Sequence, residues 1–237
     1  SAYVRSMAAR RASADSVGHT SGTYSPPSRA RPARSTSANS STGADPRALT
    51  VRPIRNMVNH ETNELFFENL EIPAENLIGE EGMGFKYILD GLNAERTLIA
   101  AECIGDGRWF VKRSAAYAGD RRVFDRPIGQ NQAIQHPLAQ SWMELEGAEM
   151  MAMRAAWKYD HGLPCGADAN AAKYMGAEAG FNACQRAMAT LGGFGYAKEY
   201  HVERYLREML IPRVAPISPQ LILCFIAEKV LALPKSY

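Results

Sequence analysis

The sequence is poor in cysteine and nearly balanced in charge, and each feature excludes a class of protein. The four cysteines stand far apart and form no C-x-x-C pair, which argues against a zinc site or a disulfide framework and favours a reducing compartment. They are Cys103, Cys165, Cys184 and Cys224. The net charge of +2 is too small to indicate nucleic acid as a partner.

Long apolar runs are also missing. The longest strongly apolar run near the end of the chain, from Leu221 to Ala227, is stopped by Glu228 and Lys229. A membrane-spanning helix needs roughly 20 apolar residues, so we expect no membrane span. The start of the sequence lacks the apolar stretch that a secretory signal contains. We therefore expect a cytoplasmic protein, or a mitochondrial matrix protein if the source is eukaryotic.

Residues 1–50 contain no glutamate and only two aspartates, but they are rich in serine and arginine. Such a segment cannot bury enough apolar surface to offset its ordering entropy, so we expect a disordered tail. Three explanations stay open: a plain tail, an Arg/Ser-rich transit peptide, or a misread stretch joined to a real domain. A basic tail that binds nucleic acid is a weaker fourth.

The pattern becomes regular from Val51 onward. Residues 64–72 are rich in Leu, Phe and Ile with a proline just after them, which predicts a strand that ends in a turn. Three glycines, Gly79, Gly82 and Gly84, then indicate a loop. We therefore expect a short β segment over 51–82 and a helical domain over 83–237.

Apolar residues recur at helical spacing in the helical domain. The pattern predicts helices over about 85–121, 131–161, 168–191 and 220–231. Asp168 is expected to cap the third helix, Gly192-Gly193 to end it, and Pro219 to lie in the first turn of the last. Four long helices with short connections predict an antiparallel four-helix bundle, so the expected fold class is mainly α.

Two motifs with possible chemistry have ordinary structural explanations. Helical bundles often hold iron between Glu-x-x-His pairs, but no carboxylate stands three residues before any late histidine, so we predict no metal site. The segment Gly192–Tyr196 is rich in glycine. It follows a helix rather than a strand, so taken alone it indicates a helix C-cap and turn.

Glu95 is the candidate general base. It lies seven residues after Ile88 and four before Ile99, on the apolar stripe of the first long helix. Burial raises the pKa of a carboxyl group, which suits a base working near neutral pH. Periodicity alone favours a plainer explanation, namely an ion pair or a stripe edge exposed to water.

Three blocks of sequence resemble the acyl-CoA dehydrogenase family. Phe67 to Gly79, with Gly84-Phe85, resembles the end of its β domain. Tyr117 to His136, with Arg121, Phe124 and Gln132 at matching positions, is similar to its FAD-binding segment. Leu191 to Arg204 is similar to its glycine-rich segment. The resemblance extends over about residues 51–237, and the blocks align with the family without an insertion or deletion between them.

The resemblance implies a reaction and its cofactor. Members of the family are enzymes that remove a proton from Cα and a hydride from Cβ of an acyl-CoA thioester, with FAD as hydride acceptor. It implies that Arg121, Phe124 and Gln132 bind the ADP part of an FAD held mainly by a neighbouring subunit. The backbone of Gly192 and Gly193 would line the same ligand. Implied partners are the acyl-CoA substrate, an electron-transfer acceptor and further copies of the chain, as a homotetramer or a dimer.

The resemblance also implies that the catalytic base of this chain lies at a different position from that in many members of the family. Many members carry it as a glutamate just before the last helix, where this chain has Pro216. Isovaleryl- and long-chain-type members use a glutamate of the first bundle helix, in a segment much like Leu92–Arg96, and Glu95 matches that position. Asn93 and Arg96 would then contact substrate, Arg96 on the CoA side. Ser218 and Gln220 replace the threonine and glutamate near the flavin, and either can hydrogen-bond.

The N-terminal helical domain and most of the β domain of the family have no counterpart in this sequence. The leading prediction is an FAD-dependent acyl-CoA dehydrogenase of fatty acid metabolism, present as a truncated chain with Glu95 as base. The alternatives are a non-catalytic bundle fragment and an acyl-CoA oxidase or flavin monooxygenase-like relative on the same fold.

Overall fold

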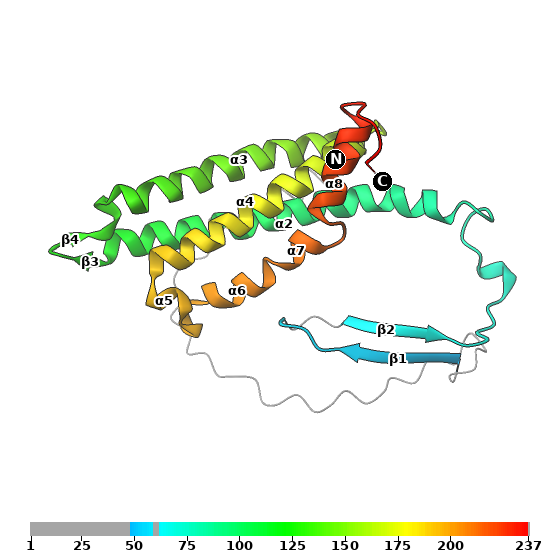
Figure 1. Ribbon diagram of the computed structural model, residues 1–237, viewed down its shortest axis with the longest axis horizontal. Helices are drawn as coiled ribbons and strands as arrows, with labels where there is room; N and C mark the ends of the chain where they lie inside the picture. Colours follow the sequence, from blue (N-terminus) through cyan, green and yellow to red (C-terminus); the bar gives the residue numbers. More distant parts are fainter. Residues whose placement is uncertain (1–47, 59–61, 237) are drawn as a thin grey trace. The chain divides into compact units, whose positions relative to one another are not determined.

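The computed structural model describes residues 48–58 and 62–236, which fall into two compact units that divide near residue 85. The predicted disordered tail, residues 1–50, lies almost wholly outside the described residues. The smaller unit contains a β-hairpin, and the larger unit is mostly helical (Figure 1).

The smaller unit contains two antiparallel strands, β1 (Leu49–Ile54) and β2 (Thr62–Phe67), paired from Leu49↔Phe67 to Ile54↔Thr62. The predicted strand was too long at its C-terminal end, because Asn69 adopts a left-handed φ of 51° that no strand accommodates. Every residue of both strands is exposed. The hairpin therefore contains no core of its own.

Three long helices form most of the larger unit and agree closely with the predicted ones (Figure 1). They are α2 (Gly84–Asp120), α3 (Gln132–Asp160) and α4 (Gly166–Leu191). The short hairpin of β3 (Arg122–Val123) and β4 (Arg126–Pro127), followed by the 3-10 turn η3 (Ile128–Gln130), connects α2 to α3. Gly162, with a φ of 64°, lies in the turn from α3 to α4.

The bundle fold is confirmed, but its fourth helix is short. The chain passes from α4 to α8 (Pro219–Lys229) through elements that the sequence pattern did not predict. They are α5 (Gly193–Tyr196), the 3-10 turn η4 (Lys198–Tyr200), α6 (Val202–Glu208) and α7 (Ile211–Val214). The segment Val202–Lys229 is apolar enough to cross a membrane by length and composition. Within it the longest helix has 11 residues, too few for the roughly 20 that a span needs.

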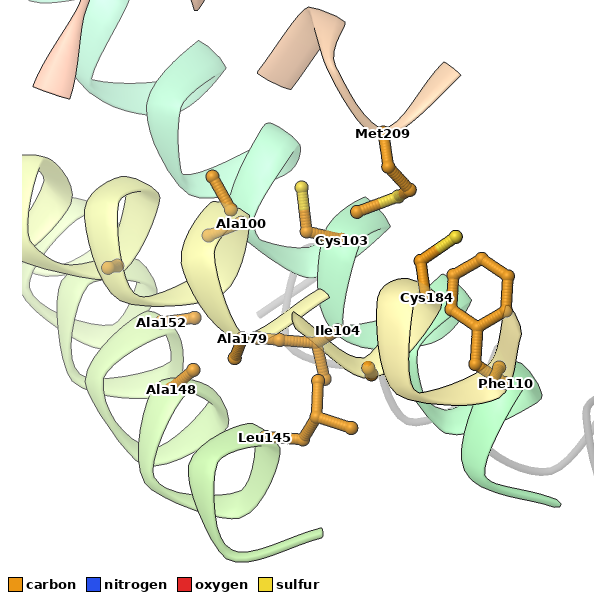
Figure 2. Packing of buried hydrophobic residues seen from close by; sticks show 14 of the residues in the cluster. Ala100, Cys103, Ile104, Phe110, Leu145, Ala148, Ala152, Ala179, Cys184 and Met209 are labelled. Carbon is orange, nitrogen blue, oxygen red and sulfur yellow. The ribbon is translucent and has the colours of Figure 1, made fainter. Parts of the chain in front are cut away.

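Small residues allow the long helices to pack closely. Alanines such as Ala148 and Ala152 of α3 face Ala179 of α4 in the core (Figure 2). A Cβ atom on Gly176 would lie 3.0 Å from the carbonyl oxygen of Ala100, and one on Gly180 would lie 2.7 Å from that of Cys103. The backbones of α2 and α4 therefore approach as near as glycine permits.

The turn between α3 and α4 is held by two cations on one carboxylate. Arg154 and Lys158 of α3 each donate to the buried Asp168 carboxylate at 2.6 Å. Burial raises the pKa of Asp168, but these two hydrogen bonds outweigh it, and the net pKa is lowered. Asp168 was predicted as the N-cap of α4, which is wrong: Cys165 occupies that position, and Asp168 lies in the first turn.

Replacing Gly180 with alanine tests the close packing of α2 and α4. The added Cβ meets the carbonyl of Cys103, which cannot move away without shifting α2. We expect a loss of about 1–3 kcal/mol in the free energy of unfolding, measured by chemical denaturation. Gly105→Ala is the matched control, since a Cβ there has no atom within 4 Å. It should be neutral or stabilise by up to about 1 kcal/mol. Equal effects of the two variants would contradict the packing argument.

Asp106 of α2 is a partly buried acid in an acidic neighbourhood. Burial, together with the charges of Glu102 and Glu208, raises the pKa of Asp106 from 3.8 to about 7. The folded chain then holds the Asp106 proton more tightly than the unfolded chain does. This contribution to stability is complete below pH 4 and is lost as the pH rises through about 7.

Asp106→Asn should therefore stabilise the protein at pH 8 but barely change it at pH 5. The neutral amide avoids the cost of ionising a buried carboxyl, and we expect a gain of about 1–3 kcal/mol at pH 8. Thermal unfolding at both pH values measures the difference. The exposed Asp90→Asn on the same helix should show no such pH dependence. A gain that is the same at both pH values would rule out titration of Asp106.

Candidate functional site

The candidate residues lie in two exposed regions of the helical unit. The first is the glycine end of α4, where Gly192 adopts a φ of 59° and its N–H donates to the carbonyl of Met188. The predicted helix C-cap is thereby confirmed. A Cβ on Gly192 or Gly193 would meet nothing within 4 Å, so the backbone there is open on its outer side. Gly195 instead packs against Met188.

An aromatic cluster joins this glycine end to the end of α2. The ring of Tyr117 lies 6.3 Å from Phe194 and 6.4 Å from Tyr200, and the last two rings are 5.0 Å apart. Arg113 of α2 lies over Tyr200 at 5.5 Å. The cluster explains why the β3–β4 hairpin and α5 occupy the same end of the helical unit (Figure 1).

The predicted FAD-binding residues at this end all point outward. Arg121 follows the last turn of α2, and its carbonyl accepts the N–H of Ile128. Phe124 lies at the hairpin tip with a φ of 52° and 94% exposure. Gln132 is the first residue of α3 and is exposed. An exposed phenylalanine in a left-handed backbone conformation is unfavourable in isolation.

The second region is the N-terminal third of α2, where Glu95 and Arg96 point to different sides. Arg96 is only 7% exposed, and its Nη1 donates to Oδ1 of Asn93 at 3.2 Å. Burial lowers the pKa of the Arg96 guanidinium, and the nearby Glu95 carboxylate offsets part of this. The buried Nε atom of Arg96 has no hydrogen-bond partner among the described residues.

Glu95 is exposed, so its carboxylate lies at the edge of the stripe and is open to water. The expectation that it is buried among apolar neighbours is not met within the described residues, where Ile88 of the same stripe is also 60% exposed. Successive residues of a helix differ by 100° in direction, so only one of Glu95 and Arg96 can face the bundle. Arg96 does, and its contact with the CoA side of a substrate stays a prediction.

The start of α8 completes the second region. The hydroxyl of Ser218 accepts the N–H of Leu221 at 3.3 Å and so caps α8, while Gln220 is exposed. The link 215–218 joins α7 to α8, and Lys173 of α4 donates to the carbonyl of Ile217 at 2.6 Å. Lys173 is 1% exposed and was missed by the sequence argument. The sequence does contain an indication that Lys173 is buried. It lies four residues after Ala169 and three before Gly176, so it shares a helix face with two packed residues of α4.

Among the described residues, no three His, Cys, Asp or Glu side chains gather closely enough to hold a metal ion. The arrangement consists instead of an outward carboxylate on α2, a capped helix start on α8, and, at the far end of the unit, an open glycine segment and the exposed Arg121. Such a surface suits an elongated ligand with anionic and polar parts rather than a metal centre.

Comparison with known proteins agrees with this arrangement. Residues 82–216 match the family model for the acyl-CoA dehydrogenase C-terminal domain. The chain belongs to the acyl-CoA dehydrogenase family, as the resemblance predicted.

Among curated relatives, the acyl-CoA dehydrogenase FadE12 of Mycobacterium tuberculosis is 40% identical over 176 residues, covering 73% of this chain and 45% of the relative. The structure of a glutaryl-coenzyme A dehydrogenase–glutaryl-CoA complex matches 80% of this chain and 49% of that chain, with a TM-score of 0.75 and 31% identity. The prolyl acyl carrier protein oxidase AnaB matches 78% and 50%, with a TM-score of 0.76 and 28% identity. The chain spans about half the length of these relatives.

Ser218→Ala tests the capping role of Ser218 separately from any ligand contact. Loss of the acceptor for the N–H of Leu221 should lower the free energy of unfolding by about 0.5–2 kcal/mol in the absence of any ligand. Ser218→Asp keeps a capping oxygen at the helix start and should recover most of the loss. Chemical denaturation of the three proteins measures both effects. A Ser218→Ala variant as stable as the parent would show that the cap contributes nothing.

Proposed function

We propose that this chain is the C-terminal part of an FAD-dependent acyl-CoA dehydrogenase and that Glu95 is its catalytic base. The observation that carries the proposal is the outward Glu95 carboxylate on α2, in a segment like that of the alternative-base members, combined with a proline at the usual base position. Proline has neither a carboxylate nor a backbone N–H, so Pro216 can supply neither a base nor an oxyanion donor.

The residues at the far end of the bundle fit the cofactor that the family implies. A pyrophosphate favours a guanidinium fork and a backbone that it can approach closely, and Arg121 and the open Gly192–Gly193 backbone offer these at one end of the helical unit. Phe124 and Gln132 lie on the same exposed hairpin and helix start. Bound FAD would supply the hydride acceptor.

In the proposed reaction Glu95 takes the proton, and the residues near it position the base and the ligands. A carboxylate within hydrogen-bond reach of the thioester Cα–H takes that proton, and its exposed position on α2 leaves it open to a substrate laid over this face. Asn93 is half-buried and held by Arg96, which limits its rotation beside the base. Ser218 and Gln220 would provide polar contacts near the flavin.

The proposal extends to partners and location. An electron-transfer acceptor would reoxidise the enzyme, and the chain would work as a homotetramer or dimer in the cytoplasm or matrix. Exposed apolar residues on α8, including Leu221 and Leu223, support association. Ile222, between these two residues, is buried within the chain. On α3, Met143, Met150 and Trp157 recur every seven residues and are more than half exposed, as in a surface that pairs with another helix.

One observation favours a second candidate function, an oxidase in which dioxygen accepts the electrons. The structural match to AnaB is as good as that to the dehydrogenases, because the same helical fold serves both. A non-catalytic fragment that pairs with another copy is the third candidate. Flavin reoxidation by air, compared with reoxidation by an artificial dye acceptor, separates the oxidase from the dehydrogenase.

Glu95→Gln, in a holoenzyme that contains this segment, tests the role of the base. The amide keeps the shape of the side chain but cannot take the Cα proton. Reduction of the flavin by acyl-CoA should slow by about 10²–10⁴-fold, while the dissociation constant of acyl-CoA changes far less. Stopped-flow absorbance reports both quantities.

Glu102→Gln is the matched control for this experiment. Glu102 is also exposed and lies two helical turns further along the same side of α2. It should leave the rate of flavin reduction unchanged. A Glu95→Gln enzyme that reduces its flavin at the parent rate would eliminate Glu95 as the base and with it the proposed mechanism.

A further inference from the structure

Lys173 is a buried lysine that the proposed chemistry does not use. It lies on α4 among packed small residues, and its side chain is 1% exposed. Its ammonium group donates to the backbone carbonyl of Ile217, 44 residues further along the chain, at 2.6 Å. A charge-assisted bond of this length is among the stronger kinds of hydrogen bond in proteins.

The surroundings of Lys173 make a purely packing role implausible. Burial lowers the pKa of its ammonium group, and the charge of Arg96 lowers it further, whereas Cys103 and Glu178 raise it. A buried ammonium group next to a second buried cation costs free energy unless its contacts compensate. An apolar side chain of similar length would fill the space at lower cost. An apolar side chain could not, however, donate the hydrogen bond that Lys173 gives to the carbonyl of Ile217.

The segment that Lys173 contacts has little regular hydrogen bonding of its own. The link 215–218 contains Pro216 and is followed by Pro219, and neither has a backbone N–H to donate. At the α7 side, Ala215 N–H donates to the carbonyl of Ile211. At the α8 side, the hydroxyl and carbonyl of Ser218 accept the N–H groups of Leu221 and Ile222. Between these two ends, the Lys173 bond fastens the link to α4.

The neighbouring helix α7 is fastened to α4 separately. Arg213 pairs with Glu178 at 2.9 Å and lies over the ring of Phe181 at 4.7 Å. Two consecutive anchors on α4, Lys173 and Glu178, therefore hold the link and α7 respectively. Removing the Lys173 hydrogen bond should loosen the link, while the Glu178–Arg213 pair keeps α7 in place.

We propose that Lys173 is a positioning residue, which fixes the link 215–218 against α4 and thereby sets where Ser218 and Gln220 stand relative to Glu95 and Arg96 on α2. This inference rests on the proposed function for its catalytic consequence. The bond between Lys173 and Ile217 itself does not depend on that function. α4 packs directly on α2 at Gly176, one turn from Lys173, so an anchor on α4 also sets the distance of the link from α2.

Lys173→Met removes the donor and keeps the length of the side chain. In this chain, amide hydrogen exchange at Ala215, Leu221 and Ile222 should become at least about tenfold faster, while exchange in the middle of α3 stays unchanged. In the full-length holoenzyme, kcat should fall by more than about tenfold with a much smaller change in KM, since the substrate still binds but the reacting groups are misplaced. Lys173→Arg retains a charged donor and should recover part of both effects.

Lys158→Met is the matched control, because Lys158 also makes a 2.6 Å bond, to Asp168 at the turn between α3 and α4. It should lower stability without faster exchange at the link and without a fall in kcat. If Lys173→Met does not fold, Lys173→Gln, whose amide is shorter and uncharged, takes its place in both measurements.

Unchanged exchange at the link would overturn the proposal, and so would faster exchange with an unchanged kcat. A fall in kcat that Lys158→Met reproduces would also overturn it. If the parent holoenzyme does not oxidise acyl-CoA at all, the proposed function fails. The exchange experiment then still decides whether Lys173 holds the link.

Discussion

The close approach of α2 and α4 is the constraint on which the rest of the helical unit depends. Gly176 and Gly180 bring the two backbones to the limit that van der Waals contact allows, opposite Ala100 and Cys103. A larger residue at either position would push the two helices apart and disturb the packing around them. The alanines shared by α3 and α4 extend the same close packing to the third helix (Figure 2).

Close packing determines which polar groups are buried. With α2 against α4, Arg96 and Lys173 lie inside the bundle, each hydrogen-bonded to an uncharged oxygen rather than to a carboxylate. Glu95, one residue before Arg96, is left on the open side. The two cations therefore lie in the interior of the bundle, whereas the Glu95 carboxylate stays on the surface.

The two candidate regions lie at different positions along the axes of the same long helices. The aromatic cluster around Tyr117 fastens the glycine end of α4 to the end of α2, and the link before α8 lies beside the middle of α4. Long helices hold such separated groups at a fixed distance, which suits an extended ligand. The relatives that share this fold include dehydrogenases and an oxidase, so the helices supply the frame and local residues decide the chemistry.

The sequence by itself determined the three long helices, most of their ends and the family. A helical repeat of apolar residues, Gly192 at a helix end and Pro219 at a helix start depend only on local backbone geometry. The short helices α5 to α7, the turn position of Asp168, the inward direction of Arg96 and the role of Lys173 were decided by the tertiary structure. These features depend on which face of each helix meets a neighbour. Periodicity identifies a stripe, but only the packing partner determines which edge of that stripe is buried.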